Sequence, residues 1–253
     1  MNIVKRLFGQ FSKSLQSEIA AKPSDERMAE CPACHGTLKK IPGRKTKCPH
    51  CGQFMYVRTR PSDLVRVVVT EIDANKIDEE WSIVNGTHDE FLAGKKAMEE
   101  EHDVLKKHFG KEPSENDVKW GVLNKQLIEH GTAGNWGFYR NTRLAMAEIL
   151  KKEGRLESAL ATYLEVCYLD LNGPENRGGM PQELREEFPL FDPKHAFLAP
   201  GIIERVKTIA RKLDLRETDI KQLFMDHGKE TSDSLKLPVS PNSCWRKLEE
   251  QLK

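Results

Sequence analysis

Four cysteines near the N-terminus constrain this chain more than any other feature of its sequence. Cys31 and Cys34 form one Cys-x-x-Cys pair, Cys48 and Cys51 form a second, and thirteen residues separate the two pairs. Two residues between paired ligands allow a tight turn that directs both sulfur atoms at one ion, so the spacing predicts a zinc site. Because four cysteine ligands leave no open coordination position, we expect the zinc to be structural and not catalytic.

Other chemistries fit the four cysteines less well. A disulfide framework is typical of exported proteins, and no signal-peptide pattern follows the basic residues Lys5 and Arg6. A redox-active cysteine pair would be expected beside a βαβ unit, which the sequence does not predict. Iron held by four thiolates stays open, because CPHCG at 48–52 is similar to a rubredoxin turn. His35 and His50 could compete as ligands, although the symmetric spacing favours the cysteines.

The segment between the cysteine pairs is strongly basic, and the strand predicted after it carries aromatic and cationic side chains. Residues 54–60, FMYVRTR, alternate as in a β-strand, with Met55, Val57 and Thr59 on the face opposite the aromatic rings. Bases stack on rings and phosphates pair with cations, so the aromatic face suits single-stranded nucleic acid or the phosphates of a duplex. The predicted nucleic-acid contacts are Lys39, Lys40, Arg44, Lys45, Lys47, Phe54, Tyr56, Arg58 and Arg60.

Charge is divided unevenly along the chain. Residues 1–60 hold twelve Lys or Arg and four Asp or Glu side chains, whereas residues 61–253 hold 28 and 35. A positive N-terminal part before a negative body predicts an acidic partner, either nucleic acid or an acidic protein surface. The alternative is that the two parts neutralise each other, with Arg58 and Arg60 pairing with the body while Phe54 and Tyr56 pack beneath the hairpin.

Residues 29–60 resemble the zinc-ribbon family, in which two cysteine knuckles joined by a hairpin hold one zinc ion. Gly36 and Gly52 follow the two cysteine pairs, and we expect them to supply the backbone freedom that each turn needs. The resemblance rests on the two cysteine pairs, and it departs from the family at His35, where glycine is common. It implies binding to nucleic acid, or docking onto protein machinery that handles nucleic acid. The order of basic N-terminus, ribbon and acidic helical body is also similar to that of zinc-ribbon proteins of bacteria and their phages, and it implies a cytoplasmic protein.

The remaining sequence predicts a mainly α protein, with the small ribbon followed by a body of several helices. We expect an amphipathic helix at 1–19, a linker at 20–29, the ribbon at 30–61, a helical domain at 62–172, a loop-rich connection at 173–198 and C-terminal helices at 199–253. The first helix would pack on the body or a sister subunit, with membrane contact as the alternative. One strand over 64–72 would pair with the strand of the ribbon.

Glycine, serine and apolar residues predict how the helices begin, end and pack. The helix that starts near residue 88 ends at Gly110, and the next begins at a serine cap and closes at Gly131. The last helix, after another serine, docks through Trp245 and Leu248. The two remaining cysteines are predicted to be buried as small apolar side chains, at positions Cys167 and Cys244.

Residues 135–173 predict two helices that meet at Gly154. Ala147, Gly154, Ala159 and Tyr163 stand where a tetratricopeptide hairpin has small, turn, small and aromatic residues, so the segment resembles one unit of that family. Arrays of such units need about three copies, and no second clear copy is present. The resemblance therefore implies one helical hairpin.

No catalytic motif is apparent. The sequence has no glycine-rich phosphate loop, no G-x-S-x-G and no H-E-x-x-H, and the single Glu-x-x-His at Glu99 and His102 lacks the second copy of a di-iron bundle. The predicted function is a non-enzymatic adaptor, whose ribbon binds nucleic acid and whose helical body contacts a protein. A purely protein-binding scaffold, or a metal-dependent nuclease built from acids such as Asp89, Glu90 and Asp117, are the alternatives.

Overall fold

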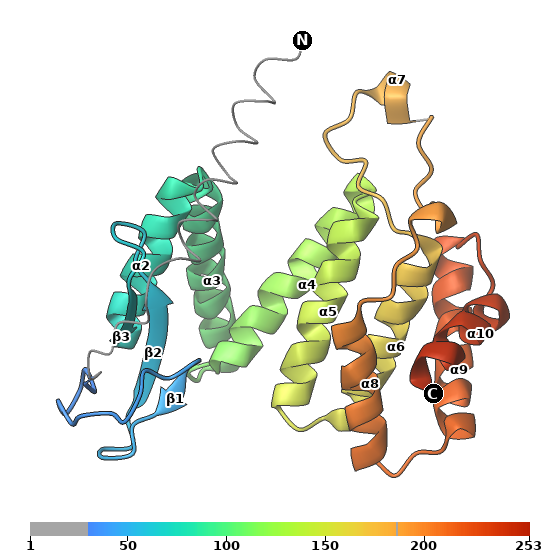
Figure 1. Cartoon of the computed structure of the whole chain (residues 1–253). Coiled ribbons are helices and arrows are strands. Elements are labelled where there is room, and N and C mark those ends of the chain that lie inside the picture. The colour runs from blue at the N-terminus through green and yellow to red at the C-terminus, as the bar shows by residue number, and fades with distance from the viewer. Residues whose placement is uncertain (1–29, 186) are drawn as a thin grey trace. The chain divides into compact units, whose positions relative to one another are not determined.

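The computed structural model describes residues 30–185 and 187–253 (Figure 1). This part of the chain contains nine α-helices and one three-stranded sheet, which confirms the prediction of a mainly α protein. It divides into two compact units between Ala93 and Gly94, and the division falls inside helix α3 (His88–Phe109). The helix expected at 1–19 and the linker expected at 20–29 lie outside the described residues.

The first unit combines the two cysteine knuckles with a small antiparallel sheet and one complete helix. The sheet has the order β1 (Thr46–Lys47), β2 (Phe54–Thr59), β3 (Arg66–Val69), and β2 is its central strand. Lys47 lies opposite Phe54 in one ladder, and Tyr56 lies opposite Val69 in the other. The expected pairing between the strand after Pro61 and the strand of the ribbon is therefore confirmed.

The strand expected at 64–72 is too long at its C-terminal end, because helix α2 (Glu71–Val84) begins there. The Thr70 side chain accepts a hydrogen bond from the Asp73 N–H at 3.2 Å and so caps the helix. The negative charge of Asp73, in the first turn, also interacts favourably with the positive end of the helix dipole. Helix α2 packs against β2, burying Ala74 and Ile77, and the Trp81 ring N–H donates to the Thr59 carbonyl at 2.6 Å.

The second unit is a helical assembly built around one buried helix. Helix α6 (Leu156–Asn172) contacts α5 (Trp136–Lys152), α8 (Pro200–Lys212), α9 (Glu217–Leu235) and α10 (Pro241–Leu252), which surround it in Figure 1. The predicted α5–α6 hairpin is present, with Gly154 at φ 78° in its turn and Ala159 and Tyr163 fully buried. Its membership of the tetratricopeptide family stays a prediction.

Several predicted helix ends are confirmed and one is wrong. Gly110, at φ 65°, follows the end of α3, and Ser114 caps α4 (Glu115–Ala133) in a reciprocal arrangement with Asp117. Helix α4 continues through Gly131 and ends at Gly134, because Gly134 is the residue that takes the left-handed conformation, at φ 72°. Four side chains expected to be buried in the second unit are buried: Cys167, Cys244, Trp245 and Leu248.

The connection between α6 and α8 is long but firmly attached. It contains one turn of helix, α7 (Gln182–Arg185), and a 3-10 turn (Pro193–His195). The Asp192 N–H donates to the Gly173 carbonyl at 2.7 Å, and a Cβ at Gly173 would lie 1.8 Å from the Asp192 carbonyl oxygen. The Glu175 carbonyl accepts from the N–H of Trp136 at the start of α5. These contacts hold the connection against the first turn of α5.

Candidate metal centre and basic hairpin

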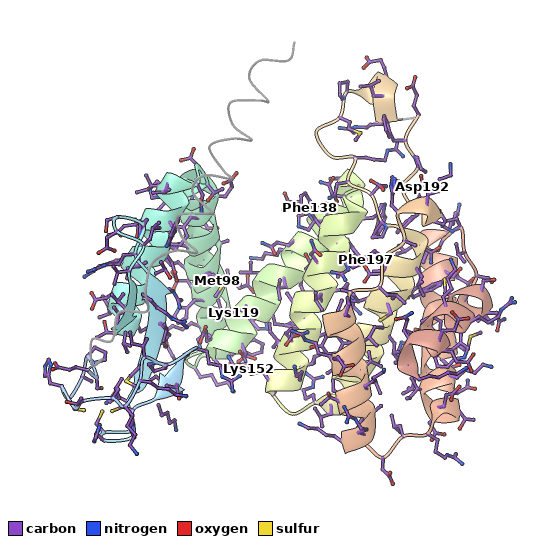
Figure 2. The ribbon with its side chains drawn as sticks, in the orientation of Figure 1. Met98, Lys119, Phe138, Lys152, Asp192 and Phe197 are labelled. Carbon is purple, nitrogen blue, oxygen red and sulfur yellow. The ribbon has the colours of Figure 1, made fainter. Side chains whose placement is uncertain are left out.

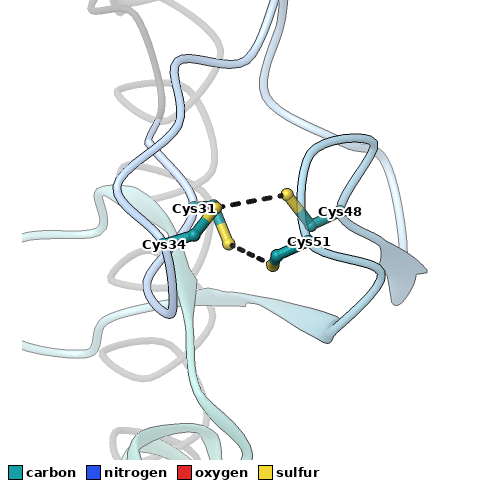
Figure 3. A group of neighbouring side chains, drawn as sticks. All are labelled: Cys31, Cys34, Cys48 and Cys51. Carbon is teal, nitrogen blue, oxygen red and sulfur yellow. Dashed lines mark hydrogen bonds between the residues drawn. The ribbon is translucent and has the colours of Figure 1, made fainter.

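The four cysteines converge on one point. The sulfur atoms of Cys31, Cys34, Cys48 and Cys51 all lie within 4.8 Å of one another (Figure 3). The sulfurs of Cys31 and Cys51 are 3.8 Å apart, as are those of Cys34 and Cys48. Four sulfurs arranged tetrahedrally at about 2.3 Å from an ion lie about 3.8 Å from one another. The donor set therefore fits a four-coordinate metal ion, as the spacing predicted.

The two cysteine pairs are built by the same backbone hydrogen bonds. In each pair, the N–H of the first cysteine donates to the carbonyl five residues later, at 2.8–2.9 Å. The N–H of the residue after the second cysteine donates back to the carbonyl of the first, at 2.9 Å. Two equal turns thus present two sulfurs each to the common centre. The residues involved are Cys31, His35 and Gly36 in the first pair and Cys48, Gly52 and Gln53 in the second.

The residue that closes each turn adopts a left-handed backbone. This residue is His35 in the first pair, at φ 56°, and Gly52 in the second, at φ 74°. The conformation costs a residue other than glycine roughly 1–2 kcal/mol. The expectation that Gly36 supplies the freedom to turn is therefore wrong, because His35 takes that position. Gly36 instead provides space, since a Cβ there would lie 2.7 Å from Cδ2 of His50.

His50 connects the two knuckles without being a ligand. Its backbone N–H donates to the Cys48 sulfur at 3.3 Å, and its ring Nε2 lies 3.0 Å from the Thr37 carbonyl oxygen. That carbonyl can only accept, so Nε2 carries the proton and donates. A hydrogen bond to a coordinating sulfur stabilises its thiolate form. His50 thus supports the site from beside the ligands, and His35 is exposed.

The thiols resist simultaneous ionisation. Burial raises the pKa of Cys31, but hydrogen bonds from the backbone N–H groups of Cys34 and Ala33 contribute to a net decrease, to about 6. The Gly36 N–H lowers the pKa of Cys34, but the neighbouring thiol of Cys51, followed by desolvation, raises it to about 12. Neighbouring thiolates repel one another, and a divalent cation removes that repulsion. The arrangement therefore suits four thiolates only when a cation is shared between them.

Beyond the ligands, the hairpin presents lysines beside aromatic rings. The Lys45 ammonium lies 4.8 Å from the centre of the Phe54 ring and 4.3 Å from that of Tyr56, and the Lys47 ammonium lies 5.3 Å from the Phe54 ring centre. Phe54 is 52% exposed, whereas Met55 on the other side of the strand is 1% exposed. We call Lys45, Lys47, Phe54 and Tyr56 the aromatic–lysine face. The predicted alternation along β2 is confirmed at these positions.

The other predicted cations of the hairpin border a pocket. A cavity of about 650 Å³, which we call the hairpin pocket, is lined by residues of the segment 37–47 together with Pro49, His50 and Met55. Lys39, Lys40 and Arg44 are exposed and line this pocket, and so does Lys47. The structure therefore distributes the predicted contacts of the hairpin between two adjacent features that share Lys47.

Arg58 and Arg60 are engaged in ion pairs. The Arg58 guanidinium donates to both carboxylate oxygens of Asp78 in α2, at 2.6 and 2.9 Å, and this hydrogen bond raises the Arg58 pKa. Arg60 donates to Asp63 at 2.5 and 3.2 Å, across the turn between β2 and β3. Pairing with acidic residues was one of the alternatives for these arginines. These ion pairs favour a role for Arg58 and Arg60 in stabilising the sheet over a role in contacting a partner.

Sequence reasoning missed one residue that shapes the hairpin. The Arg66 guanidinium, in β3, donates to the Gly43 carbonyl at the tip of the hairpin, at 2.6 Å. The two residues are 23 positions apart, and no local pattern connects them. A single cation among the valines of β3 is the only signal that the sequence offers.

The acidic residues considered for a nuclease do not form a metal site in the described part of the chain. Across residues 30–185 and 187–253, the four cysteines are the only group of three or more metal-ligating side chains close enough to hold an ion. Asp89 and Glu90 lie in the first turn of α3, and Asp117 caps α4. His102 lies with its Nε2 2.7 Å from Glu112, which raises the His102 pKa.

Comparison with known proteins adds no family: no protein-family model, no curated protein and no solved structure matches this chain. None of the described helices combines the length and the apolar content needed to cross a membrane. The interpretation of the site therefore rests on its residues and their geometry.

Proposed function

We propose that the four cysteines hold a structural zinc ion, that the ribbon binds nucleic acid through its hairpin, and that the helical unit contacts a protein partner. The observation that carries the proposal is the aromatic–lysine face. There, the exposed Phe54 ring lies 4.8 and 5.3 Å from two ammonium groups, in a stretch from residue 31 to residue 62 that contains no Asp or Glu.

The choice of zinc follows from the donor set. Four thiolates with a tetrahedral separation and no open position are the ligands of structural zinc sites. The apolar core of the ribbon includes Leu38 and Met55 beside two of the cysteines, and so small a core cannot stabilise a fold alone. Metal analysis of the purified protein should give one zinc per chain, lost when Cys48 is replaced by serine. A red protein with iron absorption bands would favour iron and contradict the proposal.

We propose nucleic acid as the ligand because the aromatic–lysine face combines positive charge with an exposed aromatic ring. Phosphates offer regularly spaced negative charge, and every base offers a flat face that can stack on Phe54. Lysines beside the ring would meet the phosphates on either side of the stacked base. The carboxylates of an acidic protein would satisfy the lysines but would leave Phe54 without a partner. This comparison favours nucleic acid over an acidic protein surface.

The test is fluorescence anisotropy of the zinc-loaded protein with labelled single- and double-stranded oligonucleotides across a salt series. Five hairpin cations that contact a single strand give a log–log salt slope of about −3.5, and Lys45→Glu/Lys47→Glu should reduce it to about −2. The matched control is Lys221→Glu/Lys229→Glu, which makes the same charge change on exposed positions of α9. The absence of binding at low salt would overturn the proposal, as would equal losses in the two variants.

A protein-binding role for the helical unit is supported by exposed aromatic side chains. Phe138 at the start of α5 is 48% exposed, and Phe197 in the connection before α8 is 68% exposed (Figure 2). Phenylalanine is enriched at protein interfaces relative to the rest of the protein surface. If the chain is a protein scaffold alone, a stable partner should co-purify after nuclease treatment and be lost in Phe138→Ser/Phe197→Ser. Unchanged co-purification in that variant would exclude this surface.

A further inference from the structure

The hairpin pocket has a composition that differs from that of the surrounding basic surface. Its rim carries the exposed cations Lys39, Lys40 and Arg44. The apolar side chains among its lining residues that are accessible to a ligand are Pro42 and Pro49, whereas Leu38 and Met55 belong to the buried core of the ribbon. The residues that line it include no Asp or Glu. A cationic rim above an apolar floor predicts a ligand that has both a negative group and an apolar surface.

The pocket is also held in shape from two directions. At the tip of the hairpin, the Arg66 guanidinium binds the Gly43 carbonyl at 2.6 Å. At the opposite end, the His50 ring binds the Thr37 carbonyl at 3.0 Å and lies against Gly36, where a Cβ would collide with it. A binding site whose walls are fixed before the ligand arrives avoids much of the entropic cost of ordering them. The hydrogen bonds of Arg66 and His50 therefore indicate a preformed pocket and not a gap between mobile side chains.

We propose that the hairpin pocket binds one nucleotide unit, with the base against Pro42 and Pro49 and the phosphates against Lys39, Lys40 and Arg44. The volume of about 650 Å³ lies within the range of pockets that hold small ligands. Inorganic phosphate would satisfy the rim but leave the floor empty. A glutamate or aspartate side chain would do the same. A nucleotide is the common ligand that uses both parts.

This binding site is separate from the aromatic–lysine face, with which it shares only Lys47 among the residues named for each. The nucleotide can come from two sources. One is a free nucleoside phosphate, which does not depend on the proposed function. The other is an unpaired nucleotide within a single strand, and this source rests on the proposed function. A duplex is not suitable, because its bases are already paired and stacked.

The experiment is calorimetric titration of the zinc-loaded full chain with ADP, adenosine, pyrophosphate and a short single-stranded oligonucleotide. The pocket variant is Lys40→Glu/Arg44→Glu, with Lys221→Glu/Lys229→Glu as the control of equal charge. Zinc content and circular dichroism verify the fold of each variant. Amide NMR spectra of the unmodified chain provide a second measurement that does not depend on any variant, since ligand in the pocket shifts resonances of residues 37–47.

We expect ADP to bind about tenfold more tightly than pyrophosphate, and the pocket variant to weaken ADP binding about tenfold while the control does not. If ADP fails to bind but the oligonucleotide binds, shifts residues 37–47 and is weakened in the pocket variant, the nucleotide belongs to a strand. Equal affinity for pyrophosphate and ADP would overturn the proposal, as would absence of shifts in residues 37–47 with every ligand. An oligonucleotide bound equally by the pocket and control variants would overturn it, and would restrict the proposed nucleic-acid contact to the aromatic–lysine face.

Discussion

Exchanging the charges of Arg58 and Asp78 would separate a structural role of this ion pair from a role in nucleic-acid binding. The pair joins the central strand β2 to helix α2 through two hydrogen bonds, at 2.6 and 2.9 Å. Arg58→Asp alone breaks the pair and places two carboxylates together. The double variant Arg58→Asp/Asp78→Arg restores opposite charges at the same positions and leaves the net charge unchanged.

The size of the effect follows from distance and exposure. Opposite charges about 4 Å apart attract by about 1 kcal/mol in bulk water and about 4 kcal/mol near a protein surface. The side chains of Arg58 and Asp78 are 33% and 37% exposed, so solvent screening places the value toward the lower limit. We expect Arg58→Asp to destabilise the first unit by about 1–2 kcal/mol and the double variant to recover at least half of that. Urea denaturation, followed by release of the bound metal to a chromogenic chelator, measures this stability.

The same variants decide whether Arg58 contacts nucleic acid. If the arginine serves the fold, the charge-exchanged protein binds a single-stranded oligonucleotide with the affinity and salt slope of the original chain. If the arginine contacts a phosphate, the exchange weakens binding and reduces the slope by about 0.7. A double variant as unstable as Arg58→Asp alone would refute the argument from the ion pair.

Three further predictions concern single positions. Arg140 pairs with Asp170 through side chains that are only 14% and 7% exposed. Arg140→Met should therefore lower the free energy of unfolding in urea by about 3–5 kcal/mol, and Arg140→Met/Asp170→Leu should recover most of that loss. A loss below about 1 kcal/mol for Arg140→Met would contradict the buried pair. His35→Gly removes a left-handed histidine and should tighten metal binding about fivefold in a chelator competition, whereas weaker binding would show that the side chain contributes. Gly173→Ala should lower the free energy of unfolding by more than about 2 kcal/mol, because a Cβ would meet the Asp192 carbonyl at 1.8 Å, and a variant as stable as the original would refute that contact.

The features that the sequence predicted are those determined by neighbouring residues. Metal-ligand spacing is a property of one short turn, so two cysteine pairs were enough to place the four sulfurs. Helix ends are equally local, because Ser114 and Gly110 act within a turn of the helices that they begin or end. The alternation in β2 placed Met55 inside and Phe54 outside, because side chains of a strand point to opposite faces.

The features that were not predicted depend on residues far apart in the chain. Sequence alternation placed Arg58 on the aromatic face but could not show that Asp78, twenty positions later, would pair with it. The hairpin pocket depends in the same way on Arg66. The prediction for the turn after Cys34 was wrong for a different reason. Gly36 is the residue type that adopts a left-handed backbone most easily, but His35, the residue before it, adopts that conformation instead. Composition alone does not reveal which of two adjacent residues a turn will strain.

Removing the metal should abolish ligand binding without unfolding the helical unit. The described core of the ribbon consists of Cys31, Leu38, Cys48 and Met55, with Val68 packed against it, so half of its fully buried members are metal ligands. Without the ion this core is too small to hold the hairpin, and the hydrogen bonds that shape the pocket and the aromatic–lysine face lose their support.

The second unit has its own core around α6 and should keep its helical signal when the metal is removed. Circular dichroism and oligonucleotide anisotropy, recorded before chelation, after chelation and after zinc is added back, test both statements. We expect most of the helical signal to persist while binding is lost and then returns. Binding that survives complete metal removal would place the contact outside the ribbon, and the helical unit would then be the surface to examine.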